Sequence, residues 1–129
     1  MRALLVVLAL ATPALAFAQP TQVVQRWFAA LEQKNFPQAM ALTQGSALQR
    51  TEHMVGRLVA EAEAHHADVE VKVKHLEVRD EGGDVLVTFD IDIVGKKWFF
   101  RRVARTLAGT ARFTLADGQR IDAIDGRLE

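Results

Sequence analysis

The 129-residue sequence contains no cysteine, no tyrosine and a single serine. Without cysteine the chain has no disulfide, no thiolate metal ligand and no cysteine nucleophile. The folded domain therefore depends on its hydrophobic core alone, which a chain of this length can supply. Without tyrosine, no phenol can donate a hydrogen bond to a developing oxyanion.

The sequence also lacks an excess of charge of either sign. It has 16 lysines and arginines and 16 aspartates and glutamates, a formal net charge of zero. A balanced chain has no general attraction to nucleic acid or to anionic membranes. We therefore expect no nucleic-acid partner, and no membrane partner once the N-terminal segment described next is removed.

Residues 1–18 have the pattern of a secretory signal peptide. Arg2 precedes an apolar run over residues 3–11, and small residues follow Pro13. The Ala16-Phe17-Ala18 triplet predicts cleavage after Ala18, with cleavage after Ala16 as the alternative. An uncleaved anchor is less well supported, because a membrane helix needs about 20 apolar residues. The sequence thus predicts an exported protein, periplasmic or secreted, with one domain over residues 19–129.

Three helices are predicted before residue 67. Apolar residues recur at helical spacing over residues 23–34, and Asn35 followed by Pro37 ends that helix and begins a second. Gly45 is expected to close the second helix. Ser46 and Gln49 form a capping-box pattern, which predicts a third helix over residues 46–65.

After Ala67 the apolar period changes from 3.6 to 2, which predicts strands. A slip in phase near Lys74-His75 indicates a bulge, and Gly82-Gly83 is a hairpin signal that would place Leu76 opposite Phe89. Gly95-Lys96 is predicted as the next turn, and Gly109 as a bend in the strand that follows. The expected strands cover residues 69–81, 84–94, 98–116 and 120–128.

The segment WFAALEQKNFPQAMAL at residues 27–42 and the last strand, DGQRIDAIDGRLE, resemble the nuclear transport factor 2-like superfamily, also called SnoaL-like or ketosteroid-isomerase-like. The resemblance covers nearly all of residues 21–129. It implies an α+β fold in which three N-terminal helices pack on a curved four-stranded antiparallel meander, a cystatin-like cone with a cavity. Many members insert a hairpin between the second and third helices, for which residues 43–46 leave no room. The resemblance implies no particular reaction.

Catalytic patterns are weak. The isomerase branch of this superfamily uses a tyrosine beside a protonated aspartate, and tyrosine is missing here. Ser46 is explained by its predicted capping role, and its neighbours do not form a nucleophile elbow. His65 and His66 diverge by about 100° on a helix, so they suit a helix C-terminus better than a metal site. We predict no catalytic residue, no metal site and no cofactor.

A ligand site, if present, is expected between the first helix and the central strands. The predicted lining residues are Trp27, Met54, Phe89, Trp98, Phe100 and Arg102. A two-residue turn at Gly95-Lys96 would place Arg102 opposite Phe89 on the apolar face and Arg101 opposite Asp90 on the other, so that Arg102 could bind a carboxylate or phosphate. A three-residue turn would pair Arg102 with Asp90, or Arg102 could extend to the rim, and these placements are favoured because the sequence does not fix the register.

The sequence therefore predicts a non-catalytic exported domain that binds a small apolar or anionic ligand or a protein partner. The alternatives are a lyase or isomerase with an atypical active site, and a structural dimerisation module. A homodimer through the sheet is expected because apolar residues interrupt its polar outer face. These residues are Leu86, Val94, Phe99 and Val103.

Overall fold

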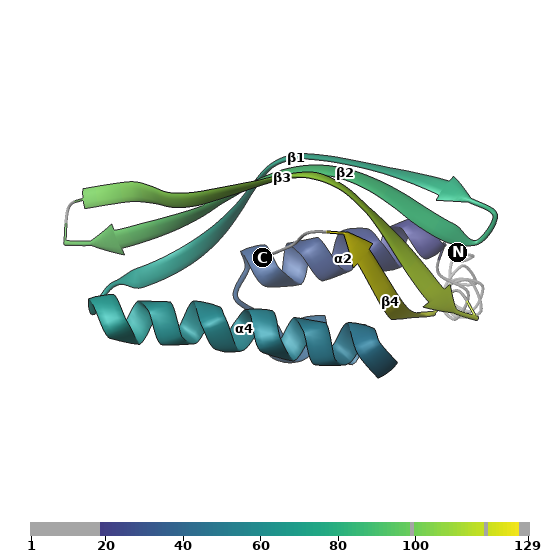
Figure 1. Ribbon diagram of the computed structural model, residues 1–129, viewed down its shortest axis with the longest axis horizontal. Coiled ribbons are helices and arrows are strands. Elements are labelled where there is room, and N and C mark those ends of the chain that lie inside the picture. The colour runs from purple at the N-terminus through teal and green to yellow at the C-terminus, as the bar shows by residue number, and fades with distance from the viewer. Residues whose placement is uncertain (1–18, 99, 118, 127–129) are drawn as a thin grey trace, which may run out of the picture.

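The computed structural model describes residues 19–98, 100–117 and 119–126 (Figure 1). Three helices, α2 (Pro20–Glu32), α3 (Phe36–Ala41) and α4 (Gly45–His65), precede four strands. The strands are β1 (Asp68–Glu81), β2 (Asp84–Lys97), β3 (Phe100–Ala116) and β4 (Arg120–Gly126). The predicted α+β architecture, with three helices before an antiparallel sheet, is confirmed. The predicted signal peptide and the end of the predicted last strand lie outside the described residues.

Helices α2 and α3 follow the sequence pattern, with Asn35 at the cap and Pro37 in the first turn of α3. The start of α4 does not. Gln44 is its N-cap, and the Ser46 hydroxyl instead donates to the Asp122 carbonyl oxygen at 3.2 Å, so the predicted capping role of Ser46 is wrong. Gly45 begins α4 at φ +57° rather than ending α3. None of the described helices is long and apolar enough to cross a bilayer.

The strands pair in the order β1-β2-β3-β4, each antiparallel to the next. The Gly82-Gly83 turn is confirmed, with Leu76 opposite Phe89, and the register of β1 shifts between Val73 and His75, where the bulge was predicted. The prediction of a turn at Gly95-Lys96 is wrong. β2 continues through these residues, and the chain reverses only between Lys97 and Phe100, which pair with each other.

The sheet is strongly curved and arches over the helices (Figure 1). Gly109 lies opposite Phe89 and has φ +155°. Residues other than glycine rarely adopt this backbone conformation. The β1 bulge is fixed from the helix side, because the Glu32 carboxylate at the end of α2 accepts a hydrogen bond from the Val73 backbone N–H at 2.9 Å. These features turn the inner face of the sheet toward α2.

The core lies between α2 and the inner face of the sheet, with Trp27 fully buried. The Trp27 ring packs edge-on against Phe28 and Phe113, with ring centroids 4.9 and 5.4 Å away. Its indole N–H donates to the Thr51 hydroxyl at 3.2 Å, and this hydroxyl donates to the Ala47 carbonyl oxygen at 2.8 Å. Trp27 thus connects α2 to α4 and to β3.

The outer face of the sheet carries cross-strand ion pairs. Lys96 and Arg101 both approach Glu70, at 3.3 and 3.4 Å. The hydrogen bond from Lys96 is the main reason why the pKa of Glu70 lies below its usual value, and the charges of Lys96 and Arg101 act in the same direction. Asp90 pairs with Lys74, at 4.0 Å, and not with Arg101 as the predicted turn required.

We expect Trp27→Ala to lower the free energy of unfolding by about 3–5 kcal/mol, because it removes a large buried aromatic ring and leaves a cavity. Urea denaturation monitored by circular dichroism measures the change. Val59→Ala is the control, because Val59 is 44% exposed and its truncation should change the stability by about 0.5 kcal/mol or less. Equal midpoints for the two variants would contradict the central role of Trp27.

Candidate functional site

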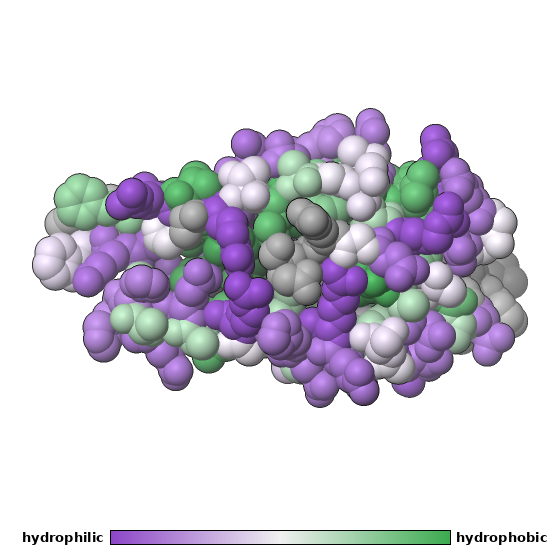
Figure 2. Space-filling model, in the orientation of Figure 1, coloured by the Kyte–Doolittle hydropathy of each residue, from purple (hydrophilic) through white to green (hydrophobic). Residues whose placement is uncertain are grey.

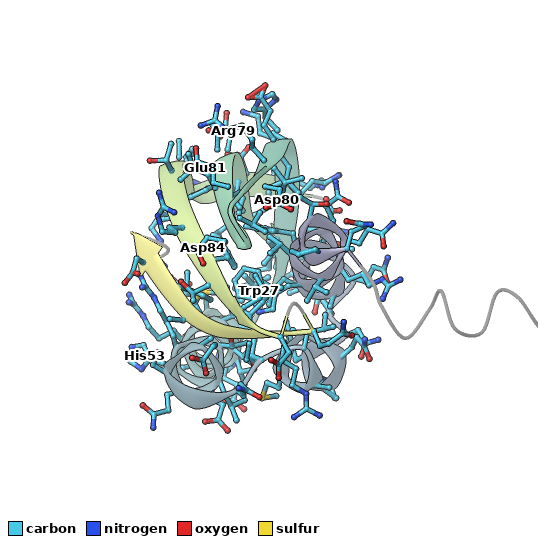
Figure 3. All side chains as sticks on the ribbon, turned by 90° about the vertical axis from the view of Figure 1, so that its right-hand side faces the viewer. Trp27, His53, Arg79, Asp80, Glu81 and Asp84 are labelled. Atoms are coloured by element: carbon cyan, nitrogen blue, oxygen red, sulfur yellow. The ribbon has the colours of Figure 1, made fainter. Side chains whose placement is uncertain are left out.

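An apolar pocket lies between α2, α4 and the inner face of the sheet. It adjoins Trp27, whose side chain lies between the helices and the sheet (Figure 3). Its volume is about 40 Å³. One water needs about 10–15 Å³, and sites for small molecules usually measure about 300–1,000 Å³. The apolar lining residues are Trp27, Phe28, Leu31, Met54, Leu58, Val71, Ile91, Ile93 and Leu107.

Two arginines complete the lining of this pocket. Arg57 comes from α4, and Arg105 comes from β3, where it lies opposite Ile93. The Nε atom of Arg105 is buried and has no hydrogen-bond partner among the described residues. No acidic side chain is among the described residues that line the pocket. A guanidinium group on an apolar wall is energetically costly unless an anion or water compensates it, so this arrangement could accept an anionic ligand.

A wider hollow of about 350 Å³ adjoins the pocket, and the two share Ile93 as a wall. The hollow lies between the last turns of α4 and the β2–β3 hairpin. Its polar residues are Glu61, His65 and Arg102. A ligand too large for the apolar pocket could therefore extend past Ile93 toward a third arginine.

The six predicted lining residues are distributed over different parts of the molecule. Trp27 and Met54 line the apolar pocket, and Phe89 is buried beside Phe28, with ring centroids 6.4 Å apart. Trp98 and Phe100 are 86% and 70% exposed at the β2–β3 hairpin, so the structure does not bring them to the pocket. Arg102 is exposed and lines the wider hollow.

The misplaced turn explains this outcome. Because β2 extends to Lys97, Arg102 lies opposite Gly95 rather than opposite Phe89, which pairs with Gly109. Sequence reasoning therefore missed Arg105. Counting back from Phe113 in steps of two, along the buried face of β3, would have placed Arg105 on the inner face. Assigning the faces of β3 from a turn at Gly95-Lys96 failed because the chain does not turn there.

The remaining polar candidates do not form a catalytic group at the pocket. His53 points away from the core on the outer side of α4 (Figure 3). Asp92 lies on the outer face of the sheet, where it accepts a hydrogen bond from the Thr106 hydroxyl at 2.9 Å and lies 3.7 Å from Lys74. The described residues contain no group of three or more histidines and acids placed to hold a metal ion.

No protein-family model matches the chain, and no curated protein matches it by sequence. Among solved structures, the chain is similar to a candidate polyketide cyclase from Pseudomonas putida KT2440, with a TM-score of 0.54 and 14% identity over 86% of this chain and 93% of that one. That protein has a SnoaL-like fold, and at this identity the likeness shows the fold alone. A de novo designed β-sheet protein also matches, with 17% identity over 83% of each chain, but its TM-score of 0.41 is too low to indicate a shared fold.

We expect Arg105→Met to raise the free energy of unfolding by about 1 kcal/mol, because it removes a half-buried guanidinium group whose buried Nε has no described partner and keeps most of the side-chain volume. Urea midpoints measure the effect. The control is Arg101→Met on the outer face, which removes an exposed ion pair and should give no gain. A loss of stability in Arg105→Met greater than in Arg101→Met would show that Arg105 supports the fold instead.

Proposed function

We propose that this chain is an exported, non-catalytic member of the NTF2-like superfamily that binds a small anionic molecule with an apolar part. The curved sheet over three helices and the likeness to a SnoaL-like fold support the cystatin-like cone of that superfamily. The pattern of residues 1–18 supports export.

The observation that carries the proposal is Arg105. Its guanidinium group lines a pocket of aliphatic and aromatic side chains, its Nε has no described partner, and Arg57 approaches from α4. Two cations beside an apolar pocket match a carboxylate with a hydrocarbon chain: the carboxylate would accept hydrogen bonds from the guanidinium groups, and the chain would fill the space next to Trp27. The small volume favours a short chain, or one that extends into the wider hollow.

A lyase or isomerase with an atypical site is the alternative. The apolar pocket offers such an enzyme two arginines but, among the described residues, no acid or imidazole. A proton would have to be moved by Glu61 or His65 of the wider hollow. Binding without catalysis therefore needs fewer assumptions.

The homodimer stays a prediction. Of the apolar residues on which it rests, Val94 is buried, Leu86 is half-buried and Val103 is exposed, whereas residue 99 lies outside the described residues. A protein partner on the sheet would use the same surface. Neither possibility conflicts with a ligand in the apolar pocket, which lies on the opposite face.

We expect linear carboxylates to bind more tightly than the alcohols of the same chain length. Isothermal titration with butanoate, hexanoate and octanoate should show affinity rising with length, by about 0.8 kcal/mol for each methylene buried, until the pocket is full. Arg105→Gln should weaken octanoate binding at least tenfold and leave octanol binding unchanged.

Arg101→Gln is the matched control, since it removes an arginine from the outer face of the same strand. Its affinity for octanoate should equal that of the parent chain. Equal affinity for octanoate and octanol, or an equal loss in the two variants, would contradict the proposal.

A further inference from the structure

The β2–β3 hairpin combines exposed aromatic side chains with positive charge. The sequence over residues 96–102 is KKWFFRR, with four cations and no acid. Trp98 and Phe100 are the most exposed of the large hydrophobic residues described. Figure 2 shows hydrophilic and hydrophobic side chains close together at this end of the molecule. Such exposure of large aromatics is unfavourable in water and indicates a surface that binds something.

Charge is distributed unevenly along the molecule, although the total is zero. The β1–β2 hairpin forms the opposite end of the sheet (Figure 1) and carries Asp80, Glu81 and Asp84 (Figure 3). Arg79 pairs with Glu81 there, and Arg112 of β3 pairs with both Glu81 and Asp84. The exposed aromatics and the cluster of cations are therefore features of the β2–β3 hairpin, and this end would be attracted to an anionic surface.

Four acids lie near the four cations of the hairpin, but the ion pairs described reach only two of these cations. Glu70 pairs with Lys96 and Arg101, and Asp68 lies opposite Lys96 in the register of the sheet. Glu61 and Glu63, on the last turns of α4, line hollows that residues of the hairpin also line. Within the described part of the chain, Lys97 and Arg102 form no ion pair. The Lys97 ammonium instead lies 6.0 Å from the centre of the Trp98 ring.

The net charge led us to expect no membrane partner, but a net charge averages over the whole chain. From the local features of this hairpin we propose that it docks on an anionic phospholipid surface. Tryptophan and phenylalanine partition into the interfacial region of a bilayer, and lysine and arginine bury their hydrocarbon stems while their charges remain at the lipid phosphates. Aromatic residues flanked by cations at one exposed end of the sheet match that environment. Docking would also bring the wider hollow, which Arg102 and Val103 line, close to the membrane.

A second copy of the chain is a less suitable occupant. The acidic β1–β2 hairpin could attract the cations, but no exposed large hydrophobic side chain is described there to cover Trp98 and Phe100. Two basic hairpins would repel each other. The bilayer offers both the negative charge and the apolar depth.

The test measures, by sedimentation, binding of residues 19–129 to vesicles of phosphatidylcholine with about 30% phosphatidylglycerol. Residues 1–18 are omitted because their apolar run would itself bind the vesicles. The sequence has two tryptophans, and Trp27 is fully buried, so a blue shift of emission on adding vesicles reports Trp98. We expect this shift, and quenching by brominated lipid, in the parent chain. Both should be absent in Trp98→Asn/Phe100→Ser; asparagine suits the left-handed backbone at residue 98, where φ is +58°.

A pair of charge variants tests the cations. Lys96→Gln/Lys97→Gln should lower the partition coefficient roughly 30-fold, since each lysine near an anionic surface contributes a factor of about five. The control, Lys72→Gln/Lys74→Gln, makes the same change of charge elsewhere on the sheet and should match the parent chain. Thermal melts establish that each variant is folded.

Three results would overturn the proposal. The first is sedimentation of Trp98→Asn/Phe100→Ser equal to that of the parent chain. The second is equal loss in the two lysine pairs, which would indicate general electrostatic attraction. The third is hairpin-dependent binding to heparin, or self-association in light scattering, without binding to vesicles; either would assign the hairpin to a soluble polyanion or to a second copy.

Discussion

Trp27 joins α2, α4 and β3 at the centre of the core. Its ring contacts Phe28 within α2 and Phe113 on β3, and its N–H is bound by Thr51 of α4. A buried indole needs such a partner, because an unsatisfied N–H in the core is costly. This side chain therefore holds two helices and the sheet at a fixed spacing. It also forms part of the wall of the apolar pocket, so that fold stability and pocket shape depend on the same group.

Local signals in the sequence were sufficient for much of the fold. The helix corner at Asn35-Pro37, the bulge after Val73 and the Gly82-Gly83 turn each follow from residue chemistry that acts within a few positions. The capping prediction for Ser46 failed because the partners of this segment are distant in sequence. The Gln44 backbone N–H donates to the Ile121 carbonyl oxygen, and the Ser46 hydroxyl donates to the Asp122 carbonyl oxygen. A contact across more than 70 residues overrides a local capping pattern, and no periodicity reveals it.

The sequence left open whether an arginine of the third strand faces the apolar side of the sheet. Arg102 was considered for that position, and the alternatives in which it lies elsewhere were favoured. In the structure Arg105 lines the apolar pocket, and Arg102 lines the wider hollow. Gly95 suggested a turn, yet it pairs with Arg102 inside the sheet, and Trp98 adopts the left-handed conformation near the true reversal. Tryptophan is an unusual residue for that conformation, so composition could not have located the turn. The same displacement moved Trp98 and Phe100 from the expected core to an exposed hairpin.

The Nε–H resonance of Arg105 in proton–nitrogen NMR reports whether an anion binds to this side chain beside Trp27, as we propose. On titration with octanoate we expect this resonance to move downfield and to exchange more slowly with water, while the Nε–H of Arg101 on the outer face remains unchanged. If octanoate binds and the Arg105 resonance does not change, the anion binds elsewhere and the proposal is wrong.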